Sequence, residues 1–274
     1  MIDSTLRGKN ALIVGVANER SLAWSIAKLL HENGVQCAFT YQGEAIEKRI
    51  KPLVESLPNL NTGSKPWIQQ MDVGSDADIQ RCFAAYKKDF GKLDILIHSV
   101  AFADKQDLEG RFADTSREGF RKAMDISAYS LVALLREAEP LMELAGGGSC
   151  VTLSYYGAEK VVKNYNVMGV AKAALESSVR YLANDLGPKK IRVNAISAGP
   201  VKTLAAAGIR GFRNILGSAE QSTPLRENIS ADDVGYLGTF LCGVGGKHIT
   251  GATLYVDSGL HILAGGFHED SKSN

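Results

Sequence analysis

The chain has 274 residues and a mass of 29.4 kDa, which suits one large α/β domain and is too long for a small disulfide-stapled fold. Lys and Arg total 31 against 30 for Asp and Glu, so a formal charge of +1 provides no basic field for a nucleic acid or an anionic membrane. The four cysteines are scattered and no uncharged apolar run reaches the roughly 18 residues of a membrane span, so we expect a cytoplasmic protein with free thiols, no metal site and no signal peptide.

The first half of the chain alternates short β-branched runs with helical patterns. We predict strands at residues 10–16, 36–41, 67–73 and 93–100, and the apolar continuity of the fourth is typical of a parallel strand covered on both faces. Helical spacing predicts a helix that starts at Ser21 and ends at Gly34, and further helices at 44–57 and from 76 onward. Thr115 and Glu118 have the spacing of a capping box that opens a long helix.

The second half continues the same alternation. We predict strands at residues 149–154, 191–197 and 252–257, with helices at 165–186 and near 231–241. The order predicts one doubly wound, Rossmann-type α/β domain over residues 1–265, with a seven-stranded parallel sheet and a loose polar tail at 266–274. In such a fold the ligand lies at the carboxyl ends of the strands, near the point where the strand order reverses.

The turn after the first predicted strand is a candidate phosphate site. Gly15 ends the strand and Ser21 opens the helix, whose N-terminus offers free amide donors and the positive end of its dipole. The segment GVANERSLA lacks the GxGxxG pattern, so by itself it also fits an ordinary strand-to-helix connection with a capping Ser.

The end of the second predicted strand bears on the choice of cofactor. Gln42 stands where NAD-binding folds usually carry an acidic residue, and the first cations, Lys48 and Arg49, come a turn into the next helix. A 2′-phosphate would therefore lack a cationic clamp, which favours NADH over NADPH. Asp72, after the third strand, can accept from an adenine amine, and it can equally well serve a local turn.

The strongest local signal is Tyr165 followed by Lys172 on a predicted helix. A spacing of seven is two turns, which places both side chains on one face about 10 Å apart along the axis. An ammonium near a phenol lowers the pKa of that phenol. Gly169 and Ala171 between them are small enough to let a cofactor or a partner helix approach. The alternative is a packed Tyr beside a surface Lys.

A competing pair is Tyr156 and Lys160, which has the Tyr-x3-Lys spacing of short-chain dehydrogenases. The pair follows the fifth strand directly, in a turn that contains Gly157, and the expected Ser is absent from residues 141–145. This pair would make the chain a carbonyl or alcohol oxidoreductase. A further alternative is a regulator that senses NADH without turnover and needs no Tyr165 and Lys172 pair.

Taken together, the motifs resemble those of the NADH-dependent enoyl-acyl carrier protein reductases, a divergent branch of the short-chain dehydrogenase/reductase family. The specific marks are the widened Tyr165-x6-Lys172 spacing, Tyr155 ten residues before Tyr165, and SAGPVKTLAA after the sixth strand. The matching segments run from about residue 8 to 258, and they are GVANERSLAWSIA, FTYQ, MDV, HSVAFA, DISAYS, LSYYGAE, NYNVMGVAKAALE, IRVNAISAGP and VKTLAAAGI.

The resemblance implies reduction of the C2=C3 double bond of trans-2-enoyl-acyl carrier protein thioesters with NADH in fatty-acid elongation. Tyr155, Tyr165 and Lys172 would be catalytic, and Lys172 would also bond the nicotinamide ribose. Further cofactor contacts would come from residues along the strand ends, namely Gly15, Ser21 and Leu22 at the pyrophosphate, Gln42 at the ribose, Asp72 and Val73 at the adenine, Val100, and Val201, Lys202, Thr203, Leu204 and Ala205 over the nicotinamide.

The resemblance also implies a substrate lid at about residues 201–216, with 204–212 as its mobile part. Together with Tyr155 and Tyr165, the substrate groove would be lined by Ala103, Met168, Ile209 and Phe212. Tyr155 would either donate a proton or contact the thioester end of the substrate. The partners would be acyl carrier protein and further copies of the chain, because the helices predicted at 115–145 and 165–186 carry more apolar surface than one sheet face needs. We expect a homotetramer.

The widened spacing agrees with the chemistry of enoyl reduction. Hydride adds to C3 of the enoyl thioester while negative charge develops on the oxygen of the C1 carbonyl, whose carbon is two bonds away. If Lys172 stays on the ribose, the phenol must stand further from it than in carbonyl reduction. Tyr165 would then hydrogen-bond the enolate oxygen in the manner of an oxyanion hole.

Four other polar residues have structural interpretations. His98 ends an apolar strand and reads as a core residue with satisfied hydrogen bonds, or as a neighbour of the cofactor. Ser154 resembles the serine that short-chain dehydrogenases keep after the fifth strand, with a doubtful catalytic role here. Asp125 and Ser127 are interpreted as a buried polar network.

Overall fold

Seven parallel strands form one sheet in the order β3-β2-β1-β4-β5-β6-β7. The computed structural model describes residues 3–58, 66–207 and 211–263. The predicted fold class, strand count and parallel direction are confirmed. The strands are β1 (Asn10–Val14), β2 (Gln36–Tyr41), β3 (Ile68–Gln70), β4 (Ile95–His98), β5 (Gly148–Ser154), β6 (Ile191–Ala198) and β7 (Thr253–Val256).

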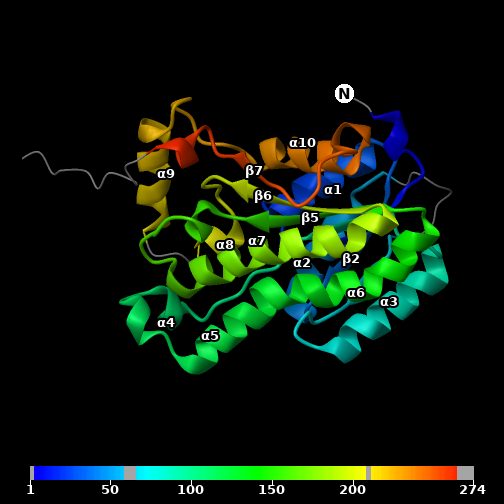
Figure 1. Cartoon of the computed structure of the whole chain (residues 1–274), viewed down its shortest axis with the longest axis horizontal. Helices are drawn as coiled ribbons and strands as arrows, with labels where there is room; N and C mark the ends of the chain where they lie inside the picture. The colour runs from blue at the N-terminus through cyan, green and yellow to red at the C-terminus, as the bar shows by residue number, and fades with distance from the viewer. Residues whose placement is uncertain (1–2, 59–65, 208–210, 264–274) are drawn as a thin grey trace, which may run out of the picture.

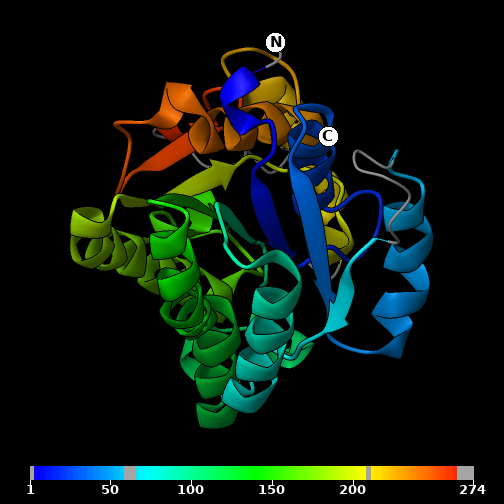
Figure 2. The same ribbon diagram turned by 90° about the vertical axis from the view of Figure 1, so that its right-hand side faces the viewer.

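Helices cover both faces of the sheet, as Figures 1 and 2 show. One apolar core joins the sheet to α1 (Leu22–Glu32), α2 (Glu44–Glu55) and α10 (Ala231–Cys242). The core on the other face joins it to α3 (Asp76–Phe90), α6 (Ser130–Leu144) and α7 (Asn166–Leu186). β4 lies between the two cores and its residues are fully buried, which explains its unbroken apolar sequence.

β1, β3 and β4 are shorter than predicted, and each leaves the sheet before its predicted carboxyl end. Residues 71–73 and 99–100 were expected as strand, but they form the loops that line one edge of the sheet. Short helices that were not predicted stand beside this edge, namely α4 (Lys105–Leu108), α8 (Leu204–Ala207) and α9 (Phe212–Ser222). Within the described segments, no helix has both the length and the apolar character to cross a bilayer.

The predicted capping box at Thr115 is wrong by one residue. The helix α5 (Arg117–Met124) has Ser116 as its N-cap, and the Ser116 hydroxyl accepts from the backbone N–H of Gly119 at 2.9 Å. The Thr115 hydroxyl instead donates to the carbonyl of Phe112 at 2.7 Å and closes a preceding 3-10 turn. Adjacent Thr and Ser both fit the cap pattern, and only the path of the preceding turn decides between them.

The long helix predicted from residue 115 is interrupted by one π-helical turn, Asp125–Tyr129, between α5 and α6. The hydroxyl of Ser127 in this turn accepts from the backbone N–H of Phe102 at 2.9 Å and donates to its carbonyl at 3.1 Å. The extra residue of a π turn changes which side chains face the sheet edge, and such turns are frequent at functional sites. The predicted polar role of Ser127 is therefore to hold the loop after β4.

We predict that Ser116→Ala destabilises the protein by about 1 kcal/mol, because it removes the cap of α5. Thr115→Ala is the matched control and should cost less than about 0.5 kcal/mol, since its hydroxyl is exposed. Thermal or urea unfolding at one fixed protein concentration measures both. Equal losses in the two variants would contradict the assignment of Ser116 as the cap.

Candidate active site

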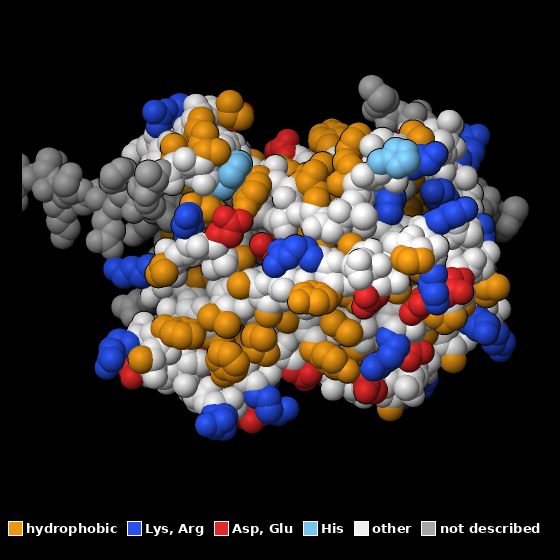
Figure 3. Space-filling view, viewed as in Figure 1, with side chains coloured by type: hydrophobic (Ala, Val, Ile, Leu, Met, Phe, Trp, Pro, Cys, Tyr) orange, Lys and Arg blue, Asp and Glu red, His pale blue; other side chains and the backbone are white. Residues whose placement is uncertain are grey.

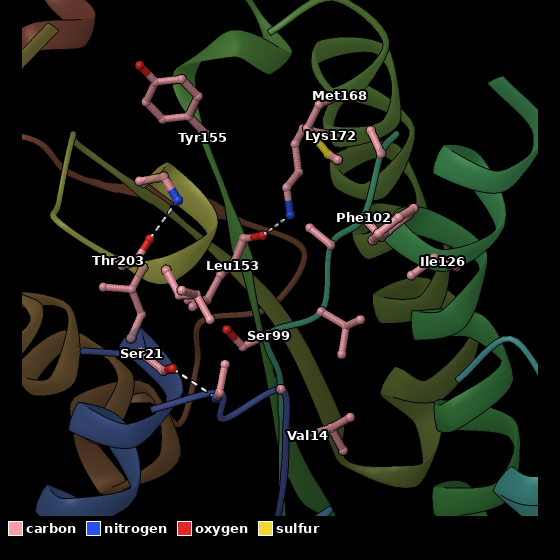
Figure 4. A pocket seen from close by; sticks show the side chains of 18 of the residues that line it. Val14, Ser21, Ser99, Phe102, Ile126, Leu153, Tyr155, Met168, Lys172 and Thr203 are labelled. Atoms are coloured by element: carbon pink, nitrogen blue, oxygen red, sulfur yellow. Dashed lines mark hydrogen bonds between the residues drawn. The ribbon is translucent and has the colours of Figure 1, made fainter. Parts of the chain in front are cut away.

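A cleft of about 1260 Å³ opens along the carboxyl ends of the strands (Figure 4). It centres on β1 and β4, where the strand order reverses, as predicted. Every predicted strand-end segment contributes lining residues, from Gly15 in the first turn to Leu204 after β6. The volume exceeds the ~300–1,000 Å³ of a typical small-molecule site, so the cleft has room for a cofactor and a substrate together.

Gly15 brings the ends of β1 and β4 into close contact. Its φ of +106° lies in the region that favours glycine, and a Cβ at this position would stand 2.1 Å from the Ser99 carbonyl oxygen. The side chain is absent where the two strands converge, so a ligand can approach the backbone of the first turn.

The Ser21 hydroxyl organises the first turn rather than capping α1. It accepts from the backbone N–H groups of Ala17 at 2.9 Å and Asn18 at 3.1 Å, and it makes no cap hydrogen bond to the helix. A hydroxyl has two acceptor sites and one donor, so in the described structure its O–H remains to donate to an anion. Ser21 lines the cleft and is 7% exposed. This geometry fits a phosphate oxygen.

Gln42 and Asp72 form a pair at the adenosine end predicted for the cleft. The Gln42 amide donates to Asp72 Oδ2 at 3.1 Å, while Asp72 Oδ1 accepts from the Gly74 N–H at 2.9 Å. Gln42 and Val73 line the cleft, whereas Asp72 stands behind Gln42 and orients its amide. The amide oxygen is then left to accept from a hydroxyl, and the Asp72 carboxylate repels a phosphate at the same place.

Tyr165 and Lys172 share one cleft, as predicted. Tyr165 is the residue that precedes α7 and Lys172 lies two turns into that helix. Both side chains line the cleft and are buried, at 8% and 6% exposure. The Tyr155 ring packs edge-on against Tyr165 with 5.0 Å between centroids and 74° between planes. Figure 4 shows Lys172 between the Tyr155 end of the cleft and the Ser21 end.

The Lys172 ammonium is anchored to β5. Its Nζ donates to the Leu153 carbonyl at 2.7 Å. Burial lowers the pKa of Lys172 to about 8, and the neighbouring Glu176 opposes that change. One of the three N–H donors is used on Leu153, so among the described residues the others remain for a ligand in the cleft.

The expected effect of Lys172 on the phenol is wrong. Burial raises the pKa of Tyr165, and Tyr155 and Glu176 raise it further. The spacing predicted that the ammonium lies on the same face, but it did not predict that burial sets the direction of the phenol's pKa. The Tyr165 phenol is therefore neutral, which makes it a hydrogen-bond donor and not a base.

The small residues between Tyr165 and Lys172 admit the chain's own turn. A Cβ on Gly169 would stand 2.7 Å from the Gly157 carbonyl oxygen, and one on Gly157 would stand 2.5 Å from the Tyr165 ring. The prediction that Gly169 admits a cofactor or a partner helix is therefore wrong. This packing fixes the Tyr165 ring against the turn that follows β5.

The competing pair lies outside the cleft. Tyr156 belongs to a short 3-10 turn, Tyr156–Ala158, and Lys160 is exposed beyond it. Neither of these described residues is among those that line the cleft. Tyr156 and Lys160 therefore do not lie together on the helix that a Tyr-x3-Lys catalytic pair requires.

Four of the six predicted acyl-groove residues meet in one apolar cluster. Ala103, Tyr155, Tyr165 and Met168 pack together there with Leu108 and Met124, among others. Of the predicted lid contacts, Val201, Thr203 and Leu204 line the cleft and Ala205 lies in α8. Lys202 is exposed and stands outside the lining. Phe212 begins α9 and Ile209 lies outside the described residues.

One wall of the cleft is formed by residues that were not predicted as site residues. Phe102, Lys122 and Ile126 line it, and the Lys122 ammonium stands 4.5 Å from the centre of the Phe102 ring. Ile126 comes from the π turn and Lys122 from α5 (Figure 4 labels Phe102 and Ile126). A straight-helix pattern cannot place Ile126, because the turn shifts the helical phase.

Two buried polar neighbours of the cleft, His98 and Ser154, have hydrogen-bond partners. His98 is fully buried and bonds the hydroxyls of Thr152 at 2.7 Å and Ser130 at 2.9 Å, and burial lowers its pKa to about 3. It is a neutral core residue, as predicted. Ser154 lines the cleft, but its hydroxyl donates to the Glu176 carboxylate.

The chain is similar to enoyl-acyl carrier protein reductases over nearly its whole length. A family model described as enoyl-(acyl carrier protein) reductase matches residues 15–261. The chain is 47% identical to the Bacillus cereus enoyl-[acyl-carrier-protein] reductase [NADH] FabI over 258 residues, which are 94% of this chain and 98% of the relative. The Aquifex aeolicus protein of the same name is 50% identical over 94% of this chain and 93% of its own.

Solved structures are similarly close. The Anaplasma phagocytophilum enoyl-(acyl-carrier-protein) reductase in complex with NAD has a TM-score of 0.89 at 48% identity, covering 96% of this chain and 98% of that one. The Bacillus cereus enzyme with NADP+ and indole naphthyridinone has a TM-score of 0.90 at 47% identity, covering 94% and 98%.

We predict that Gly15→Ala lowers the melting temperature sharply, because the backbone oxygen of Ser99 cannot move aside as a flexible side chain would. The strained φ alone costs on the order of 1–3 kcal/mol. Gly187→Ala is the matched control, since nothing lies within 4 Å of a Cβ at that position. Similar melting curves for the two variants would show that the strand ends do not converge as described.

Proposed function

The chain belongs to the enoyl-(acyl carrier protein) reductase family, and we propose that Tyr165, Lys172 and Tyr155 form its active centre. It is an NADH-dependent enoyl-acyl carrier protein reductase of fatty-acid synthesis. The observation that supports this assignment best is the burial of a neutral phenol and an ammonium in one cleft at the point where strand order reverses. The substrate is a trans-2-enoyl thioester on acyl carrier protein, and the bond reduced is its C2=C3 double bond.

The cleft provides the contacts that a dinucleotide needs. The Ser21 hydroxyl and the first turn at Gly15 would hold the pyrophosphate, and Leu22 stands beside them. Gln42 would accept from the adenosine ribose, with Val73 at the adenine and Asp72 acting through Gln42. Lys172 would donate to the nicotinamide ribose. When bound, NADH supplies the hydride that adds to C3.

Tyr165 would donate a hydrogen bond to the C1 carbonyl oxygen as negative charge develops on it. A neutral phenol suits this role, because a phenolate would repel the forming enolate. Tyr155 would contact the thioester end, since burial raises the pKa of its phenol too and its ring supports Tyr165 from the side. C2 of the enolate would then take a proton from solvent, which balances the hydride added at C3.

Residues 201–216 would form the substrate lid. Val201, Thr203 and Leu204 line the cleft, and the Thr203 hydroxyl accepts from the Ala206 N–H at 3.1 Å at the start of α8. Val100, Thr203 and Leu204 would complete the cofactor contacts from within the cleft, whereas Lys202 stands outside the lining. Ala103, Met168, Ile209 and Phe212 would receive the acyl chain. We place the enzyme in the cytoplasm, where its cysteines stay reduced.

We predict that Tyr165→Phe lowers kcat about 10²–10³-fold, because it removes one donor to the developing oxyanion. Tyr156→Phe should stay within about twofold of wild type, since Tyr156 does not line the cleft. The assay follows NADH oxidation at 340 nm with crotonyl-CoA. Loss of turnover in Tyr156→Phe alone would favour the carbonyl reductase, and no turnover of any enoyl thioester by wild type would favour the NADH sensor.

We propose in addition that the chain forms a homotetramer. Apolar side chains gather over α5, α6 and α7 in Figure 3. Exposed members on these helices and the adjoining turn include Phe120 at 39%, Tyr129 at 45% and Tyr181 at 73% exposure. Single exposed apolar residues are ordinary, but a patch that continues across neighbouring helices is typical of an interface.

Sedimentation velocity should give a species of about four times the 29.4 kDa chain mass. Tyr129→Glu should shift that species toward smaller assemblies, because it buries a charge in the apolar contact. Lys51→Glu on α2, which covers the opposite face of the sheet, should leave the assembly intact. A lone 29.4 kDa species from the wild-type chain contradicts the tetramer.

A further inference from the structure

A buried carboxylate lies directly behind the cleft. Glu176 is 8% exposed and follows Lys172 by one turn on α7, where residues four apart are neighbours. Its Oε1 accepts from the hydroxyl of Ser154, at the end of β5. The carboxylate, the hydroxyl and the ammonium thus occupy the same junction between α7 and β5.

The two charged groups at this junction act on each other, and Glu176 ranks higher among the influences on the pKa of Lys172 than Lys172 does among those on Glu176. Burial raises the pKa of Glu176, whereas the Ser154 hydrogen bond and the Lys172 charge lower it. Burial lowers the pKa of Lys172 to about 8, and Glu176 raises it. An isolated buried ion tends to become neutral, so a partner is what keeps it charged.

The other titratable groups around the junction do not replace Glu176. His98 on β4 is neutral, with a pKa of about 3 that the Lys172 charge helps to depress. Glu159, after the 3-10 turn, and Arg180 on α7 act on Glu176 in opposite directions. Tyr165 keeps its proton. Glu176 is therefore the acidic neighbour that raises the pKa of Lys172.

We propose that Glu176 and Ser154 are positioning residues for Lys172, Glu176 holding its ammonium charged and Ser154 holding the Glu176 carboxylate in place. The inference rests on the proposed contact of Lys172 with the nicotinamide ribose. It also explains why Ser154, although it lines the cleft, is not a donor to substrate: its O–H is committed to Glu176.

The test is the pH dependence of NADH binding, followed by the fluorescence of the bound cofactor. Glu176→Gln removes the charge and keeps the shape, and a neighbouring opposite charge shifts a pKa by about 1–3 units. The loss of affinity at alkaline pH should therefore begin at least one pH unit lower than in wild type. NADH affinity should fall about tenfold at pH 8.5 and less than about threefold at pH 6.

The control is Asp185→Asn, which removes the same charge from an exposed position further along α7. It should leave the pH profile unchanged. Glu176→Asp restores the charge and should return most of the alkaline affinity. Ser154→Ala should shift the profile in the same direction as Glu176→Gln by a smaller amount, and Ser154→Thr should restore it.

Equal loss of affinity at both pH values in Glu176→Gln, or no loss at either, overturns the proposal. If Glu176→Gln does not fold, the comparison of Glu176→Asp, Ser154→Ala and Ser154→Thr decides it, and unshifted profiles in all three overturn it. Lys172→Met separates this result from a failure of the proposed function. If Lys172→Met binds NADH normally, the ribose assignment is wrong. If it loses affinity while Glu176→Gln keeps the wild-type profile, the role of Glu176 alone is wrong.

Discussion

The buried ammonium of Lys172 is the interaction on which the rest of the cleft depends. A charge at 6% exposure is costly unless its hydrogen bonds and its counter-charge are fixed in advance. The carbonyl of Leu153, the next-to-last residue of β5, accepts the hydrogen bond, and Glu176 on α7 provides the counter-charge. Because the two come from different elements, the strand and the helix must dock in one register. That register also determines where Tyr165, two turns before Lys172, enters the cleft.

The same docking sets the protonation state of the phenol. Tyr165 is closed in by Tyr155 on one side and by the Gly157 turn on another, and each contact removes water from the ring. Burial then raises the pKa of the phenol. In enoyl reduction the oxygen that gains charge is three bonds from the carbon that receives hydride, so the chemistry requires a neutral donor that stands well away from the Lys172 ammonium. The widened spacing and the apolar surroundings act together to provide it.

Much of this arrangement follows from sequence, and the limits have physical causes. The apolar continuity of residues 95–98 predicts a strand covered on both faces, and the alternation of strands and helices predicts the sheet and its ligand-binding edge. The Tyr165 and Lys172 spacing predicts a shared face. Spacing carries no information about desolvation, so the direction of the Tyr165 pKa was predicted wrongly. Likewise the cap at Ser116 and the inward turn of Ile126 depend on a 3-10 turn and a π turn that helical periodicity does not encode.

Selection of the cofactor shows how one residue can act through another. Sequence position alone suggested that Asp72 meets the adenine, but its carboxylate is held between the Gly74 N–H and the Gln42 amide. Gln42 lines the cleft with its amide N–H committed to Asp72, which leaves its amide oxygen as the group suited to a ribose hydroxyl donor. A 2′-phosphate at that point would meet a carbonyl oxygen with a carboxylate behind it. Many NAD-binding folds place a carboxylate directly against the ribose. Here the carboxylate of Asp72 stands behind Gln42 instead, and its negative charge still disfavours the phosphorylated cofactor by repulsion.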